Sequence, residues 1–142
     1  MVSSSVLAIH SANAVCTMEM CSAFSKNGYN TTLCVPKSNH SNEELLAYYG
    51  VEHVFDIIQE SMPETFIRGG LPGRALVFAV LAVNRLRKMK NHIIYSRNPW
   101  FFFILSVLLK RHAIFEAHQF RFNGRIQTAI YRTLIKYSSN SN

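Results

Sequence analysis

The sequence lacks any apolar run long enough to cross a bilayer. Its longest unbroken runs are Ala75–Val83 and Trp100–Ile104, whereas a spanning helix needs roughly 18 to 20 apolar residues. Cysteine is also scarce, because Cys16, Cys21 and Cys34 are odd in number and show no CxxC spacing. This pattern predicts neither a disulfide framework nor a zinc site. We therefore expect no metal and a cytoplasmic location.

Two nucleotide-binding motifs are missing as well. The loop His10–Val15 holds no glycine, so the GxGxxG turn that lets a backbone approach a pyrophosphate is absent. The next apolar run ends in Pro36 and Lys37, where a dinucleotide site has an acidic residue. A Walker A lysine motif is not found either. These absences argue against a nicotinamide cofactor, and we predict no cofactor.

Acidic residues are few. Only 16% of the 142 residues are charged, 49% are hydrophobic, and 15 Lys and Arg against 8 Asp and Glu give a net charge of +7. This length and composition indicate one domain with a single apolar core. The basic surplus favours anionic partners such as phosphates or acidic lipid, although it is equally typical of a soluble basic surface.

Short apolar runs alternate with segments of helical periodicity along the chain. The runs rich in β-forming residues predict strands at Val6–His10, Tyr29–Val35, His53–Ile58, His92–Ser96 and Ala113–Ala117. Helices are predicted at Val15–Lys26, Ser41–Tyr49, Arg74–Lys90, Trp100–Leu109 and Phe122–Tyr137. Glycine and proline between Gln59 and Gly73 predict a mobile loop.

The alternation of strands and helices predicts an α/β fold. We expect a single Rossmann-like, doubly wound parallel sheet of about five strands with helices on both faces, spanning residues 1–137, and a frayed tail over 138–142. Ligands of such sheets bind beyond the carboxyl ends of the strands. With strand order 3-2-1-4-5, the loops that matter most are Ser11–Cys16, Arg97–Pro99 and His118–Phe120.

Several short motifs suggest a family. The helix end Ser25–Tyr29 leads into Thr32–Pro36, and Ile94–Arg97 and Phe115–His118 follow further along. Over nearly the whole chain this pattern resembles the N-terminal, acceptor-side domain of family 4 glycosyltransferases of GT-B fold. The resemblance implies transfer of a sugar from a nucleotide donor with retention, without a metal, and with the donor held mainly by a second domain.

That second domain is missing from the sequence. The chain is therefore expected to be the acceptor-binding half of such an enzyme, truncated and inactive alone, with a sugar or lipid-linked acceptor and a donor domain or partner subunit as its partners. The alternative is a non-catalytic Rossmann-like binding module, or one subunit of a two-protein transferase. A nucleic-acid binder is not expected, because no recognisable module or aromatic-basic interleaving is present.

The polar residues that end the fourth and fifth expected strands are the candidate site. By resemblance His118 faces the cleft and contacts the donor sugar or the reacting centre, and a capping or surface histidine is the alternative. Glu116, two residues earlier, lies on the same side of a regular strand and is either a reactant or an orienting group. Arg97 could clamp a phosphate through its two-pronged guanidinium, or it could be a solvated arginine paired with a carboxylate.

The start of the first helix offers a second set of contacts. Its free backbone N–H groups and positive dipole end favour an anion. Ser11, Asn13 and Thr17 could add hydroxyl and amide contacts to an acceptor or phosphate. The resembled family commonly has glycines in this loop, and this chain has none.

Basic residues gather on one face of the last expected helix. Arg125, Arg132 and Lys136 lie there, on another face than the apolar positions of that helix. Together with Arg85, Arg87, Lys88 and Lys90, they predict a surface that rests on anionic lipid and would make the protein peripheral at the inner face of the membrane. An ordinary solvated helix face is the alternative.

Overall fold

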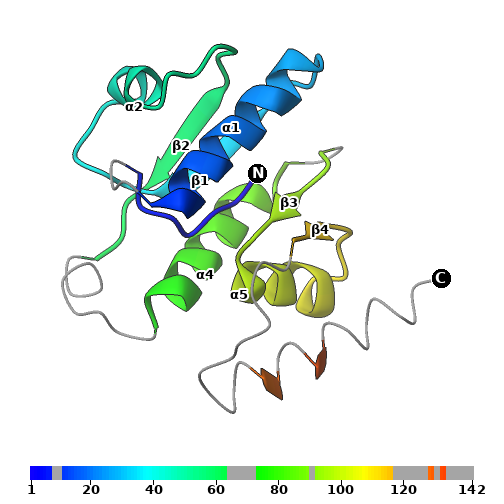
Figure 1. Cartoon of the computed structure of the whole chain (residues 1–142). Coiled ribbons are helices and arrows are strands. Elements are labelled where there is room, and N and C mark those ends of the chain that lie inside the picture. Colours follow the sequence, from blue (N-terminus) through cyan, green and yellow to red (C-terminus); the bar gives the residue numbers. More distant parts are fainter. Residues whose placement is uncertain (8–10, 64–72, 90–91, 117–127, 130–131, 134–142) are drawn as a thin grey trace.

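The computed structural model describes residues 1–7, 11–63, 73–89, 92–116, 128–129 and 132–133. The expected tail, most of the expected last helix and most of the expected loop at 59–73 lie outside these residues. The elements in chain order are α1 (Ala12–Lys26), β1 (Thr32–Pro36), α2 (Asn42–Tyr48), β2 (Asp56–Glu60), α4 (Arg74–Leu86), β3 (Tyr95–Ser96), α5 (Pro99–Phe102), the π-helix η1 (Phe103–Leu108) and β4 (Ile114–Phe115) (Figure 1).

Polar side chains fix where the helices begin. Ser11 Oγ accepts from the backbone N–H of Ala14 at 3.2 Å and caps α1. At α2, Ser41 Oγ accepts from Glu44 N at 3.2 Å and the Glu44 carboxylate accepts from Ser41 N at 2.8 Å, which completes a capping box. The serine expected to open this helix is therefore its cap. α1 begins three residues earlier than the sequence pattern predicts, because Ser11 rather than a later residue supplies the cap.

The prediction of one five-stranded Rossmann-like sheet is wrong for the described residues. They form two small parallel sheets of two strands each, β1 with β2 and β3 with β4. Val2 lies between the two sheets and makes isolated parallel bridges to Cys34 and to Ser96. Segments from five parts of the chain therefore run side by side, but a continuous five-stranded ladder is not formed.

The ladder is short because serine side chains compete with it. A strand is predicted at Val6–His10, but the segment that meets β1 and β3 is earlier, with Val2 N donating to Tyr95 O at 2.8 Å and Ser3 N to Cys34 O at 3.1 Å. The N–H of Ser5 then donates to Ser3 Oγ at 3.3 Å instead of to a neighbouring strand. Such local bonds from serine offer the backbone an alternative to sheet pairing.

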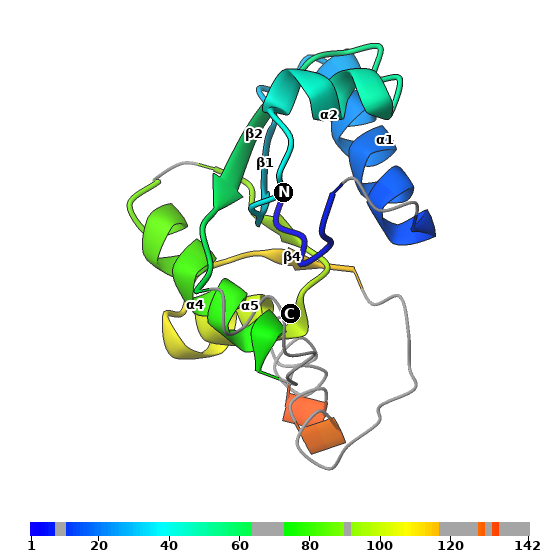
Figure 2. The same cartoon turned by 90° about the vertical axis from the view of Figure 1, so that its left-hand side faces the viewer.

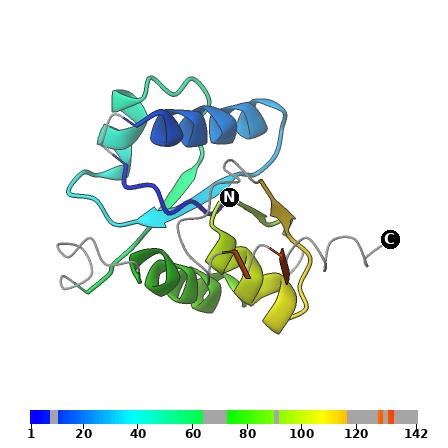
Figure 3. The ribbon, with the colours of Figure 1, turned by 60° about the horizontal axis from the view of Figure 1, so that its bottom comes forward.

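Helices cover the strands from two sides. Figure 2 and Figure 3 show α1 and α2 on one side of the strands and α4 and α5 on the other. β1 separates two apolar clusters, because Leu33 and Val35 pack with α1 and α2 whereas Cys34 packs with α4, α5 and η1. Successive side chains of a strand point to opposite faces, so a single strand serves both clusters.

Asn98 joins the end of β3 to two helices. Its side chain is fully buried, Oδ1 accepts from Trp100 N at 2.9 Å and from Phe101 N at 3.2 Å, and Nδ2 donates to Ala75 O at 3.1 Å. This residue caps α5 and also ties it to the start of α4. The strand must end here, because the backbone turns at Asn98 to begin the helix.

Candidate functional site

Arg97 and Glu116 lie at the carboxyl ends of two neighbouring strands. β3 and β4 are parallel with Ser96 opposite Phe115, and Glu116 N donates to Ser96 O at 3.0 Å. The residues that follow each strand are therefore held beside one another. Parallel strands place such residues at the same edge of a sheet, which is where α/β proteins commonly bind ligands.

Arg97 is the best-buried charged side chain of this edge. Its side chain is only 5% exposed, Nη2 donates to Glu116 Oε1 at 3.3 Å, and Nη1 donates to Thr17 Oγ1 at 3.3 Å. Nε is buried and has no hydrogen-bond partner among the described residues. A guanidinium has five N–H donors, so Arg97 combines a fixed position with an unmatched donor.

Glu116 is held at both of its carboxylate oxygens. Arg97 donates to Oε1, and the phenol of Tyr95 donates to Oε2. Burial first, and then the hydrogen bond to Glu116, raise the pKa of Tyr95 above its usual value, so this phenol remains a donor. Tyr95 also packs edge-on against Phe24 with ring centroids 5.9 Å apart. Because both of its carboxylate oxygens accept hydrogen bonds, Glu116 is placed to orient Arg97.

Thr17 brings α1 into this cluster. Its hydroxyl donates to Asn13 O at 2.8 Å, one turn earlier, and is thereby turned to accept from Arg97. The hydroxyls of Thr17 and Ser3 are 3.5 Å apart, and Asn13 Nδ2 donates to Ser5 Oγ at 2.5 Å. We call Thr17, Tyr95, Arg97 and Glu116 the Arg97 cluster.

The structure brings together four of the residues singled out in the sequence. Asn13, Thr17, Arg97 and Glu116 form one connected network, and Ser11 lies at the same end of α1 as its cap. Sequence reasoning missed Tyr95, although its position two residues before Arg97 on a strand places both on one face. It also missed Ser3 and Ser5, because the first strand was placed too late in the chain.

The remaining site predictions are untested by the described residues. His118, Arg125 and Lys136 lie outside them. Arg132 is described and exposed. Its place in a membrane-contacting surface stays a prediction.

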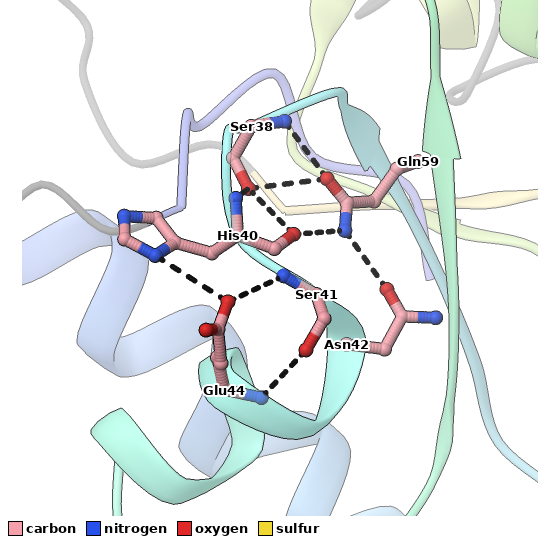
Figure 4. Close-up of polar contacts among 6 residues, drawn as sticks. All are labelled: Ser38, His40, Ser41, Asn42, Glu44 and Gln59. Carbon is pink, nitrogen blue, oxygen red and sulfur yellow. Dashed lines mark hydrogen bonds and ion pairs between the residues drawn. The ribbon is translucent and has the colours of Figure 1, made fainter.

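A second polar cluster follows the ends of β1 and β2 (Figure 4). The Gln59 side chain accepts from Ser38 N at 2.8 Å and from Ser38 Oγ at 3.1 Å, and donates to His40 O at 3.0 Å and to Asn42 Oδ1 at 2.9 Å. The imidazole of His40 lies 3.7 Å from the Glu44 carboxylate. Gln59 has all its hydrogen-bonding capacity engaged within the chain, so this cluster fixes the loop between β1 and α2.

The three cysteines are free, as the sequence predicts. Cys16 is exposed on α1, whereas Cys21 and Cys34 are buried. Over the described ranges, no group of three His, Cys, Asp or Glu side chains could hold a metal ion. Within the part of the chain that the structure describes, no helix combines the length and the apolar character needed to cross a bilayer.

Comparisons of the chain with protein-family models, with curated protein sequences and with solved structures found no match. Function must therefore be argued from the chemistry of the Arg97 cluster.

Proposed function

We propose that the chain binds the acceptor of a glycosyl transfer, a sugar or a lipid-linked phosphate, at the Arg97 cluster. The observation that supports this proposal is the position of Arg97, which is buried between Thr17 and Glu116 and whose Nε has no partner within the described part of the chain. Guanidinium groups bind phosphate and sugar oxygens through paired N–H donors. The neighbouring Thr17 hydroxyl and Glu116 carboxylate hold the guanidinium in place.

The proposal gives the chain the acceptor side of the reaction only. A nucleotide-sugar donor would be supplied with a further domain or a partner subunit, and the chain alone would not transfer sugar. The donor is a substrate in this scheme, and no metal or resident cofactor takes part in it.

Acceptor binding is tested by isothermal titration of the chain with farnesyl phosphate, and with farnesol as the uncharged control. We expect the phosphate to bind and farnesol not to bind. Arg97→Lys keeps the positive charge but loses the paired N–H donors of the guanidinium, and should weaken phosphate binding about tenfold. An equal affinity of the native chain for both compounds would contradict a phosphate site.

A matched pair of threonine variants controls for folding. Thr17→Val and Thr31→Val each remove one buried hydroxyl, but Thr31 lies at the amino end of β1 and its hydroxyl donates to Tyr29 O at 3.1 Å. We expect Thr17→Val to weaken phosphate binding severalfold and Thr31→Val to leave it unchanged. Equal losses in the two variants would place the ligand elsewhere.

The alternative function is a non-catalytic binding module. The observation in its favour is that both oxygens of Glu116 are engaged, which suits an orienting role better than a reactant. Transfer assays with a supplied donor domain distinguish the acceptor-binding half of a transferase from a non-catalytic binding module. In an active pair, His118→Ala should lower turnover strongly, whereas a module that only binds would give no turnover with any donor domain.

A further inference from the structure

Exposed aliphatic side chains occur at the end of η1 and just before β3, away from the Arg97 cluster. Leu108 is 61% exposed and Leu109 is 45% exposed, just after the buried part of η1, and Ile93 is 78% exposed before β3. Three large aliphatic side chains at one end of a small domain are not needed for its core. Exposed apolar groups of this kind commonly mark an interaction surface when polar residues surround them.

Arg111 fixes these segments relative to one another. Its guanidinium donates to Leu86 O at 3.3 Å, to Arg87 O at 3.1 Å and to Met89 O at 2.7 Å, so the turn after η1 lies against the end of α4. Ile93 lines the same pocket as Leu86 and Met89. Arg111, which follows η1, and Ile93, which precedes β3, therefore both lie near the end of α4.

The charged residues in the segments that carry these aliphatic side chains are all positive. Arg87, Lys88 and Lys110 are exposed, and every charged residue between Glu64 and Glu116 is a lysine or an arginine. Cations at a helix C-terminus stabilise the helix dipole, which accounts in part for Arg87 and Lys88. The same effect applies to Lys110, which follows the C-cap of η1 at Leu109, but it does not account for the aliphatic side chains. We call Arg87, Lys88, Ile93, Leu108, Leu109 and Lys110 the basic apolar surface.

Lys110 also occupies a backbone conformation that suits another residue. Its φ is 52°, in the left-handed region where glycine has no steric penalty and most other residues do. Glycine at this position would relax the turn, so a Lys110→Gly change can remove the side chain without straining the backbone.

We propose that the basic apolar surface rests on an anionic lipid bilayer. Leu108, Leu109 and Ile93 would enter the headgroup region, and the surrounding cations would contact lipid phosphates. A nucleic acid fits the charge but not the side chains, since aliphatic groups do not stack on bases as aromatic rings do. The surface is separate from the Arg97 cluster, so this proposal does not depend on the proposed acceptor site.

Co-sedimentation with vesicles tests the proposal. The native chain should sediment with vesicles of phosphatidylcholine and phosphatidylglycerol, should stay in solution with pure phosphatidylcholine, and should be released by high salt. The double change Lys88→Gln with Lys110→Gln should weaken binding about 30-fold, at about 1 kcal/mol for each cation. Leu108→Ser with Leu109→Ser should weaken it roughly tenfold or more.

Two further double or triple variants locate the surface. Lys37→Gln with Arg74→Gln removes the same charge at the other end of the strands and should weaken binding much less. Charge reversal at Arg125, Arg132 and Lys136 tests the last expected helix instead. Loss of binding in that triple variant, with full binding in the Lys88 and Lys110 variant, would overturn the proposal. So would a native chain that ignores anionic vesicles, or one that binds RNA in their place.

Lys110→Gly separates lipid contact from folding. The change relaxes the left-handed backbone and removes a cation, so it should raise the urea midpoint while weakening vesicle binding about fivefold. Lys110→Arg should keep vesicle binding. If Lys110→Gly binds vesicles as tightly as the native chain, Lys110 is not a lipid contact and the surface is wrongly assigned.

Discussion

The guanidinium of Arg97 donates through Nη1 to Thr17 Oγ1 at 3.3 Å, a contact between residues 80 positions apart in the chain. It joins the second turn of α1 to the end of β3. The same guanidinium holds Glu116 after β4, so three segments that are distant in sequence meet at one buried charge. A charge in this position is stable only while its partners remain in place.

Removing the charge should therefore destabilise the fold. Arg97→Met leaves the Glu116 carboxylate, which is 26% exposed, with Tyr95 but without its ion-pair partner. We expect the free energy of unfolding to fall by about 2 to 4 kcal/mol, measured by urea denaturation. Arg87→Met is the control, because Arg87 is exposed and should change stability by less than about 0.5 kcal/mol. Equal effects of the two changes would contradict a structural role for Arg97.

The polar residues at the strand ends could be predicted from the sequence because an apolar run that breaks into polar residues is a local signal. Arg97 and Glu116 were found in this way. Their contact with Thr17 follows from the arrangement of α1 over the strands, and no local pattern encodes it. Residues 117–127 lie outside the described part of the chain, so the place of His118 stays a prediction.

The sheet was predicted less well than the helices. Helix starts depend on one cap and the following turn, so Ser41 and Asn98 are readable from local sequence. Strand extent depends on which distant backbone is available to pair, and at Ser5 a neighbouring hydroxyl takes the N–H instead. The apolar run at Val6 and Leu7 therefore indicated a strand, whereas pairing occurs at Val2.

Asn98 should be one of the most sensitive single positions. Asn98→Ala removes the cap of α5 and leaves the partly buried carbonyl of Ala75 without the donor that Asn98 supplies. We expect a loss of about 2 to 3 kcal/mol in the free energy of unfolding. Asn98→Ser keeps an acceptor for the cap and should lose about half as much. The single tryptophan, Trp100, lies in the capped turn, so its fluorescence in urea provides the measurement. If serine were as damaging as alanine, the cap would not be the source of the loss.

The stability of the fold should depend on the two hydrogen bonds that the Gln59 amide donates. Gln59→Glu keeps the oxygen that accepts from Ser38 but places a carboxylate oxygen against His40 O and Asn42 Oδ1. We expect the free energy of unfolding to fall by about 1 to 2 kcal/mol at pH 7. Below pH of about 4.3 the carboxyl is protonated and can donate again, so part of the loss should be recovered. A deficit that is unchanged between pH 7 and pH 4 would argue against the two donated bonds.

The cysteines should differ strongly in reactivity. Cys16 is exposed, whereas Cys21 and Cys34 are both at most 1% exposed. Burial raises the pKa of Cys21 to about 11 and that of Cys34 to about 12. Because the thiolate is the reactive form, a disulfide reagent at pH 8 should modify one thiol quickly in the native chain and three in denaturant. Cys16→Ser should abolish the fast phase, and a fast phase that survives would mean that a buried thiol is accessible.

The same two buried thiols should make the fold sensitive to alkali. A raised pKa in the folded state means that the unfolded chain releases its thiol protons first, near pH 9, while the folded chain retains them until about pH 11 for Cys21 and about pH 12 for Cys34. The free energy of unfolding should therefore be independent of these thiols below pH 9. It should fall from pH 9 to about pH 11 for Cys21 and to about pH 12 for Cys34, by about 1 kcal/mol for each thiol at pH 10. Urea denaturation at pH 8 and pH 10 measures this slope.

The control variant is Cys21→Ala, which lowers stability through lost packing at both pH values. It should reduce the difference in the free energy of unfolding between pH 8 and pH 10 by about 1 kcal/mol. Tyr95 adds to the slope only above its usual pKa near 10 and is present in both proteins, so an unchanged difference in Cys21→Ala would show that the buried thiol is not the group that titrates.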